Sequence, residues 1–182
     1  GAVPCPDGFL TKLDPTGTTA LYSTYLGGAG FDQIFGIAVN AAEEVFVTGS
    51  TSSADFPLQN PMQAAIGGGT CPAGTCSDVF VTRLDATGSG SIYSTFLGGS
   101  DADAGQAIFV DGSDNAFVTG FVGSVDFPAT PGGFQLTAGG TSSSGDAFVA
   151  KIGPADASGL VIAPIKLTFA EQPKTFASTA ST

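Results

Sequence analysis

The sequence predicts an all-β protein built from repeated four-stranded antiparallel units, the blades of an incomplete β-propeller. The first observation is an internal repeat: from Phe9 to Pro57, 23 of 49 residues are identical to those found 71 positions later. The second is that each copy contains short runs of β-branched and aromatic residues that end at Gly-rich turns. The third is that no segment carries the 3.6-residue apolar period of a helix. Four-stranded units in series are typical of propellers.

The second copy of the repeat shows the four strands of one unit. Four runs in it are rich in Val, Ile, Phe and Thr: 80–85, 92–97, 107–111 and 116–120. The last two flank a Gly-Ser-Asp-Asn sequence whose residues supply turn conformations, so we expect them to form a hairpin. A third copy begins at Ala147, 68 residues after the second. The Gly-, Thr- and Ser-rich segments 58–77 and 129–145 are predicted to be long surface loops.

In such a propeller each strand of a unit has an expected place, from the innermost to the outermost: 36–40, 45–50, 80–85 and 92–97. The innermost strands of adjacent units, 36–40 and 107–111, should then lie side by side. The chain holds two outer strands of one blade, one whole blade over 34–97 and three strands of another over 105–152, about two and a quarter blades. Because a propeller closes with at least four blades, this chain does not close one alone.

A C-terminal segment, 154–182, follows the blades of residues 1–153 and is predicted to be a linker, an extended strand and a flexible tail. In its strand Ile165, Leu167 and Phe169 share one face. A strand with one apolar face and no sheet of its own must find an edge elsewhere. We expect strand addition to another copy or another part of a parent chain, with completion of the open third unit as the alternative.

Composition excludes several classes of function. The net charge is −11, from 5 basic and 16 acidic residues, so the basic face of a nucleic-acid-binding protein is missing. The absence of His leaves no imidazole for catalysis or metal binding. No apolar run approaches the roughly 20 residues of a membrane-spanning helix. No Gly-x-Ser-x-Gly elbow occurs, and we expect neither an enzyme nor a cofactor.

The acidic loop 100–105 contains candidate calcium ligands, Asp101 and Asp103. Only Asp103 has a counterpart in the first copy, Asp32, because Asp101 aligns with a glycine. The loop also lacks the Gly and the distal Glu of a calcium-binding loop. A turn held by bonds from side chains to the backbone is therefore the preferred interpretation.

Charged residues recur at three positions of the repeat: Lys12, Arg83 and Lys151; Asp7, Asp78 and Asp146; and Asp55 with Asp126. A catalytic pair would normally occur once and not in every unit. The recurrence therefore indicates a structural role, such as a partly buried ion pair between strands.

Cysteine spacing predicts one disulfide. Cys71 and Cys76 enclose a Pro-Ala-Gly-Thr turn that can bring their sulfurs together. Zinc usually takes four N or S ligands, and three Cys without His do not supply them, which leaves a free pair as the main alternative. A disulfide implies a secreted, surface or periplasmic location. Cys5 aligns with Cys76 at the repeat offset, so its partner is expected outside the chain, with a free thiol as the alternative.

Four motifs resemble the bacterial SBBP-type β-propeller repeat over about residues 8–152: Tyr-Ser-Thr-Tyr-Leu-Gly-Gly at 22–28, Gly-Ile-Ala-Val at 36–39, Val-Phe-Val-Thr-Gly-Ser-Thr at 45–51 and Asp-Phe-Pro at 55–57. The resemblance implies blades of large secreted or surface-attached bacterial proteins, and it brings no catalytic residues. The stretch 160–173 resembles the opening strand of a bacterial immunoglobulin-like domain.

The combined expectation is a non-catalytic extracellular structural or interaction module, part of a larger bacterial secreted or cell-surface protein or filament. Its partners would be other blades, or copies, of the same or the parent protein. The alternative is a propeller that binds a glycan or Ca²⁺. An accessory part of an extracellular enzyme is a less favoured alternative.

Overall fold

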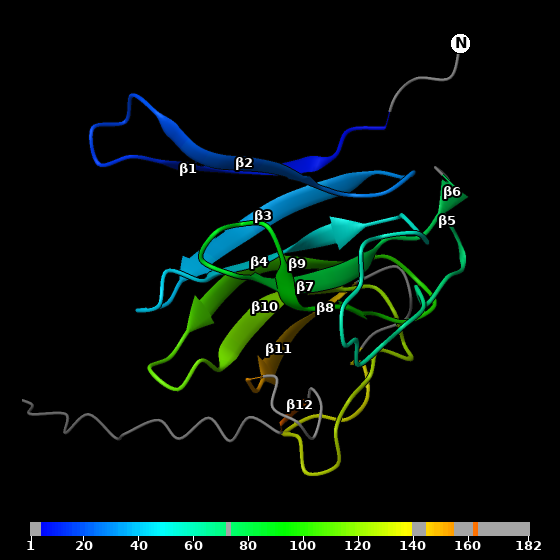
Figure 1. The fold of residues 1–182 in the computed structure, drawn as a ribbon. Coiled ribbons are helices and arrows are strands. Elements are labelled where there is room, and N and C mark those ends of the chain that lie inside the picture. Colours follow the sequence, from blue (N-terminus) through cyan, green and yellow to red (C-terminus); the bar gives the residue numbers. More distant parts are fainter. Residues whose placement is uncertain (1–4, 72–73, 140–144, 155–161, 164–182) are drawn as a thin grey trace, which may run out of the picture.

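The computed structural model describes residues 5–71, 74–139, 145–154 and 162–163, and all regular elements in these ranges are β-strands (Figure 1). The strands form three antiparallel sheets that follow one another in chain order, the N-terminal, central and C-terminal sheets, and a separate small hairpin. The predicted all-β class is confirmed. Within these ranges no helix exists that could span a membrane.

The central sheet contains four strands in the order β3 (Asp32–Val39), β4 (Val45–Thr51), β7 (Asp78–Leu84) and β8 (Ser91–Leu97). Every neighbouring pair is antiparallel. Every residue of β7 is buried, because this strand lies inside the sheet and other sheets cover both of its faces. The strand order is the one that the repeat predicts.

The N-terminal sheet has two strands, β1 (Gly8–Leu13) and β2 (Ala20–Leu26). The C-terminal sheet contains, from its first strand outward, β9 (Asp103–Val110), β10 (Ala116–Val122), β11 (Asp146–Ile152) and β12 (Ile162–Ala163). The hairpin of β5 (Thr70–Cys71) and β6 (Gly74–Thr75) projects from the loop that joins β4 to β7. In Figure 1 the β1–β2 pair lies at one end of the stack, and β11 and β12 lie at the other.

Two hydrophobic clusters hold the three sheets together. Between the N-terminal and central sheets, Leu10 packs in a cluster with Phe80. Between the central and C-terminal sheets, Phe46 packs in a cluster with Val118. The strands β3 and β9 lie side by side as predicted, since a β-carbon added to Gly36 would meet the backbone of β9. Burial of apolar surface between sheets is therefore what joins the repeat units.

The described strands do not form a closed ring. One feature differs from the sequence-based expectations. The segment 58–77, predicted to be a surface loop without strands, contains the β5–β6 hairpin and a β-bridge between Gln59 and Ser94 of β8. The bridge forms because β8 is an edge strand whose outward backbone groups need partners. The predicted strand with Ile165, Leu167 and Phe169 lies outside the described residues.

Candidate functional site

The turn between β2 and β3 connects the N-terminal sheet to the central sheet, and three polar side chains hold it. The amides of residues 28–30 each donate one hydrogen bond of 2.8 Å, in turn to Asp32 Oδ2, Asp55 Oδ1 and Ser53 Oγ. The Ser53 hydroxyl donates to the same Asp32 oxygen over 2.7 Å. Each of these three backbone donors therefore has a side-chain acceptor from the next sheet or the segment after β4.

The turn between β8 and β9 repeats this arrangement at the next junction. The amides of residues 99–101 donate to Asp103 Oδ2, Asp126 Oδ1 and Ser124 Oγ over 2.9, 2.8 and 2.8 Å. The Ser124 hydroxyl lies 2.7 Å from Asp103 Oδ2. We call each of these sets a junction clasp. One clasp contains Asp32, Ser53 and Asp55, and the other contains Asp103, Ser124 and Asp126. The sequence analysis singled out the aspartates of both clasps but missed the serines, although Ser53 and Ser124 are identical at the repeat offset.

Burial and close packing fix each clasp. A β-carbon on Gly28 would lie only 2.5 Å from Asp55 Oδ1, and one on Gly99 would collide with Asp126, so both turns require glycine. Asp103 is fully buried. Its burial raises the pKa of the carboxyl above the ordinary value, while hydrogen bonds from Gly99 and Ser124 act in the opposite direction.

An ion pair also crosses each junction. Lys12 of β1 lies 2.6 Å from Glu43, in the turn between β3 and β4 of the central sheet. Arg83 of β7 lies 2.7 Å from Asp114, in the turn between β9 and β10 of the C-terminal sheet. The two pairs are equivalent at the 71-residue offset. Both acidic residues have positive φ, 63° and 61°. The sequence predicted ion pairs at the recurring basic position but did not identify these partners.

Arg83 is the more buried of the two cations. It also donates to Glu44 of its own sheet, and its guanidinium stacks 4.9 Å from the ring centre of Phe46. Lys151, at the same repeat position, lies 5.6 Å from the ring centre of Phe117. In the described part of the chain no carboxylate lies within ion-pair distance of Lys151.

Asp78, the first residue of β7, is a buried carboxylate. One oxygen, Oδ2, accepts hydrogen bonds from the Gly67 amide (2.7 Å) and the Gln63 side chain (3.0 Å). The other, Oδ1, is buried without a partner in the protein. Burial raises the pKa of Asp78 from 3.8 to about 6, and the nearby charge of Asp103 acts in the same direction.

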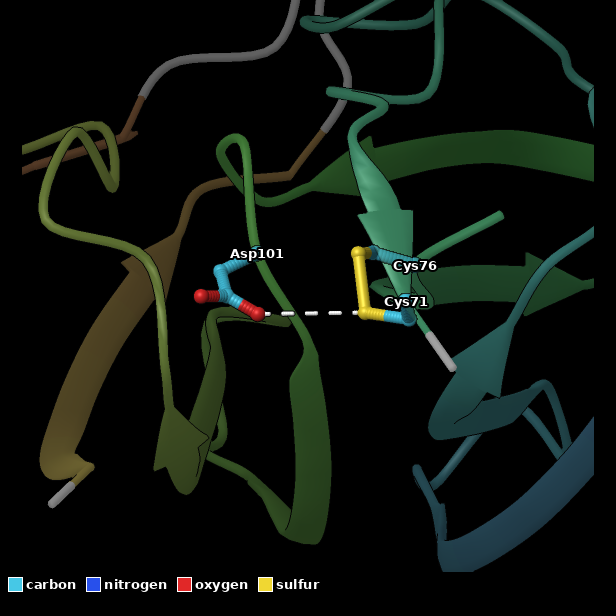
Figure 2. A group of neighbouring side chains, drawn as sticks. All are labelled: Cys71, Cys76 and Asp101. Atoms are coloured by element: carbon cyan, nitrogen blue, oxygen red, sulfur yellow. Dashed lines mark hydrogen bonds between the residues drawn. A yellow bond between two sulfur atoms is a disulfide. The ribbon is translucent and has the colours of Figure 1, made fainter. Parts of the chain in front are cut away.

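Cys71 and Cys76 form the predicted disulfide, with their Cα atoms 5.0 Å apart. Figure 2 shows Asp101 facing this bond, with its Oδ1 atom 3.8 Å from the Cys71 sulfur. A disulfide sulfur carries no proton, so this approach is a contact and not a hydrogen bond. The donor atoms of the three residues lie within 4.8 Å of one another. Since the sulfurs are bonded to each other, neither is the thiolate that a metal would need.

The two candidate calcium ligands have different roles. Asp103 directs its oxygens at the amides of Gly99, Gly123 and Ser124 within a junction clasp. Asp101 faces the disulfide and accepts a hydrogen bond from the Ala102 amide. Both residues therefore belong to a turn that hydrogen bonds between side chains and the backbone stabilise. This is the interpretation of the acidic loop that the sequence analysis preferred. Cys5 is half-buried and forms no disulfide in the structure.

A cavity of about 280 Å³ lies beside the outer edge of β11. Residues 125–138, which follow β10, form its other wall, with Phe134 and Leu136 among the lining side chains. Both side chains are exposed, Phe134 almost completely at 99%. The hollow is therefore an open, largely apolar space next to a sheet edge.

Comparisons with protein-family models and with curated proteins give no match for this chain. The arrangement at the junctions is thus the main evidence for function. It consists of polar groups that satisfy one another within the protein, repeated at successive sheets.

Proposed function

We propose that this chain is a non-catalytic structural module of an extracellular protein, whose repeated sheets are blades of a β-propeller. The observation that carries the proposal is that two successive junctions use equivalent clasps and equivalent ion pairs. In repeat proteins the contacts between neighbouring units supply the stability, so a contact set that recurs at each boundary serves assembly.

The proposed setting is a larger bacterial secreted or cell-surface protein or filament, in which other blades, or copies, of the same or the parent protein are the partners. The motifs that resemble SBBP-type repeats support this setting. The disulfide is compatible with an oxidising, extracellular location. The net charge of −11 disfavours a nucleic-acid partner.

Thermal unfolding with added Ca²⁺, with EDTA and with a panel of glycans tests this proposal. A ligand that binds the folded state raises the midpoint of unfolding. We expect the same midpoint in all conditions. A concentration-dependent rise with Ca²⁺ or a glycan would contradict the structural role and support a ligand-binding propeller.

A further inference from the structure

The inner edge of β1 is open, and an apolar face beside it is uncovered. Within the described ranges β1 pairs only with β2, whereas its counterpart β7 also pairs with β4. Ile37 and Val39 of β3 are 59% and 55% exposed. They lie opposite Val47 and Val45 of β4, which are buried in the cluster that contains Leu10. The N-terminal sheet therefore covers β4 but leaves the neighbouring apolar positions of β3 uncovered.

The next junction shows what covers the equivalent surface. Ile108 and Val110 of β9 are the counterparts of the two exposed residues of β3 at the 71-residue offset. Both are partly buried and pack against the cluster that contains Phe46. The strands β3 and β4 lie over β9 there, and β4 pairs along the inner edge of β7. A two-stranded hairpin therefore closes this surface at one junction, and the matching surface beside β1 has no such cover in the described residues.

We propose that the inner edge of β1 and the exposed face of β3 form an acceptor for a β-hairpin of the β3–β4 type, and that a partner protein with a further repeat unit supplies this hairpin. Addition of a strand to an open sheet edge is a common mode of recognition. A second copy of this chain does not supply the hairpin, because β4 and β10 already pair with β7 and β11 of their own sheets. The inference deepens the proposed structural role, on which it rests, by naming the partner.

The central sheet indicates which backbone groups of β1 face the partner. The Phe80 carbonyl of β7 accepts a 2.9 Å hydrogen bond from the Thr48 hydroxyl of β4, so the backbone groups of Phe80 point toward β4. Backbone groups of alternate residues point to the same side of a strand, so those of Thr82 also face β4. The counterparts of these two residues in β1 are Phe9 and Thr11. Their amides therefore point out of the open edge, where a partner strand would bond to them.

The cation of β1 selects an aromatic ring and a carboxylate in the partner hairpin. Arg83 of β7 lies opposite Phe46 of β4, stacks 4.9 Å from its ring centre and donates to Glu44. Lys151 of β11 likewise lies 5.6 Å from the ring centre of the phenylalanine opposite it in β10. Lys12 is the third cation at this position of the repeat. The partner strand is therefore expected to place a phenylalanine opposite Lys12, with an acidic residue two positions earlier.

Close packing determines two further residues of the partner strand. The counterpart of Phe9 in β7 lies opposite Gly49, where a β-carbon would come within 2.9 Å of the ring, so the partner needs glycine opposite Phe9. The residue before that glycine must be smaller than its counterpart Thr48. Ile34 stands where β9 has Gly105, and a β-carbon on Gly105 would collide with the Thr48 hydroxyl. The expected pattern of the partner strand is therefore Phe-x-Ala-Gly.

An NMR titration of the full chain with a synthetic hairpin tests the proposal. The probe has the sequence of residues 32–51 and is cyclised through a two-residue turn, because an isolated two-stranded hairpin is only marginally stable. It is made in two forms, with Thr48 and with Thr48→Ala. We expect the alanine form to bind at least about tenfold more tightly. At saturation it should slow hydrogen exchange of the Phe9 and Thr11 amides at least about tenfold.

Two proline variants of the chain locate the binding edge. Thr11→Pro removes an amide from the open edge of β1 and should weaken binding of the alanine form at least about tenfold. Ser23→Pro is the matched control, because Ser23 lies opposite Thr11 and the two hydroxyls bond to each other over 2.8 Å. The amide of its counterpart Ser94 points away from β7. Ser23→Pro should therefore keep the affinity, and the amide of Val81 reports that each variant remains folded.

Four results would overturn the inference. Absence of saturable binding, or equal weakening in both proline variants, would show that β1 accepts no hairpin. Equal affinity for the two forms of the probe would show that the register is wrong. Slow exchange of the Phe9 and Thr11 amides without the probe would show that the chain covers this edge itself. Protection that rises with protein concentration would show that a second copy covers it. The ligand screen that tests the proposed function measures none of these quantities, so the two failures are distinguishable.

Discussion

Arg83 in the central sheet donates a 2.7 Å hydrogen bond to Asp114 in the C-terminal sheet, and this ion pair joins the two sheets beside a hydrophobic cluster. The equivalent pair at the preceding junction is Lys12 with Glu43. In both cases a cation on the third strand of a unit contacts the first hairpin of the next unit. The contact therefore specifies how consecutive sheets are placed against each other.

Replacement of this arginine is expected to weaken the protein more than replacement of its counterpart. Arg83→Met leaves Glu44 and Asp114 without their cation in a partly buried place, and we expect a loss of about 3 kcal/mol in the free energy of unfolding. Lys12→Met, the matched control, removes a solvent-exposed pair and should cost less than about 1 kcal/mol. Urea titration of both variants measures the difference. Equal losses would contradict the role of burial.

Loss of the clasp serine should destabilise the junction. The Ser124 hydroxyl lies between Asp103 and the Asp101 amide and is buried, so Ser124→Ala leaves both groups without this partner. We expect a cost of about 1–3 kcal/mol. Ser100→Ala removes a 2.9 Å hydrogen bond that an exposed hydroxyl of the same turn donates to Asp126, and it should cost less, at most about 1 kcal/mol, because water can replace this donor. If urea titration gives the same value for both, the clasp does not stabilise the junction.

The sequence was sufficient to predict the strands and their order in the central sheet. Strand runs, Gly-rich turns and the repeat are local or periodic signals. The order of the strands across the sheet, from 36–40 to 92–97, follows from them. The disulfide was predicted from the spacing of Cys71 and Cys76 and the turn between them. These features depend on residues that are close in sequence or repeat identically.

The contacts between sheets could not be predicted to the same extent. Glu43 aligns with Asp114 and Lys12 with Arg83, so neither position is identical in the two copies. Their pairing depends on how closely one sheet approaches a hairpin of the next, which no local pattern encodes. The covering of β8 by the loop after β4 was missed for a similar reason, since Gln59 carries no strand signal of its own.

Asp78 should make stability depend on pH. The folded-state pKa of about 6 lies above the ordinary 3.8, so the folded protein binds more protons between these values. The contribution of this residue to stability is therefore largest below pH 4 and falls as the pH rises through 6. Asp78→Asn keeps an acceptor for Gly67 and Gln63 but does not ionise.

The measurement is the free energy of unfolding of Asp78→Asn relative to the unaltered chain at several pH values. We expect the variant to gain about 2 kcal/mol between pH 4 and pH 7 relative to the unaltered protein. Comparison at each pH cancels the contributions of the other carboxyl groups, apart from the coupling to Asp103. A constant difference across this range would show that Asp78 does not titrate as a buried group.

Asp101 should protect the disulfide from reduction by anionic thiolates. Its carboxylate oxygen lies 3.8 Å from the Cys71 sulfur, so an attacking thiolate meets a negative charge there. Asp101→Asn is expected to speed reduction by glutathione about two- to fivefold at low salt, and less at high salt because ions screen the charge. Glu43→Gln makes the same charge change far from the bond and should leave the rate unchanged. Identical rates for Asp101→Asn and the unaltered chain would rule out this protection.

Two phenylalanines at one repeat position should differ in their contribution to stability. Phe56 is 3% exposed and packs against Phe80 and Phe96, with ring centres 4.7 and 6.1 Å apart. Phe127 packs against Phe148 at 4.9 Å but is only partly buried, because the described part of the C-terminal sheet offers no ring equivalent to Phe96. Phe56→Ala leaves a cavity in a closed cluster and should cost about 3–5 kcal/mol, whereas Phe127→Ala should cost about half as much. Urea titration decides between this ranking and equal losses, which would mean that both rings are equally enclosed in solution.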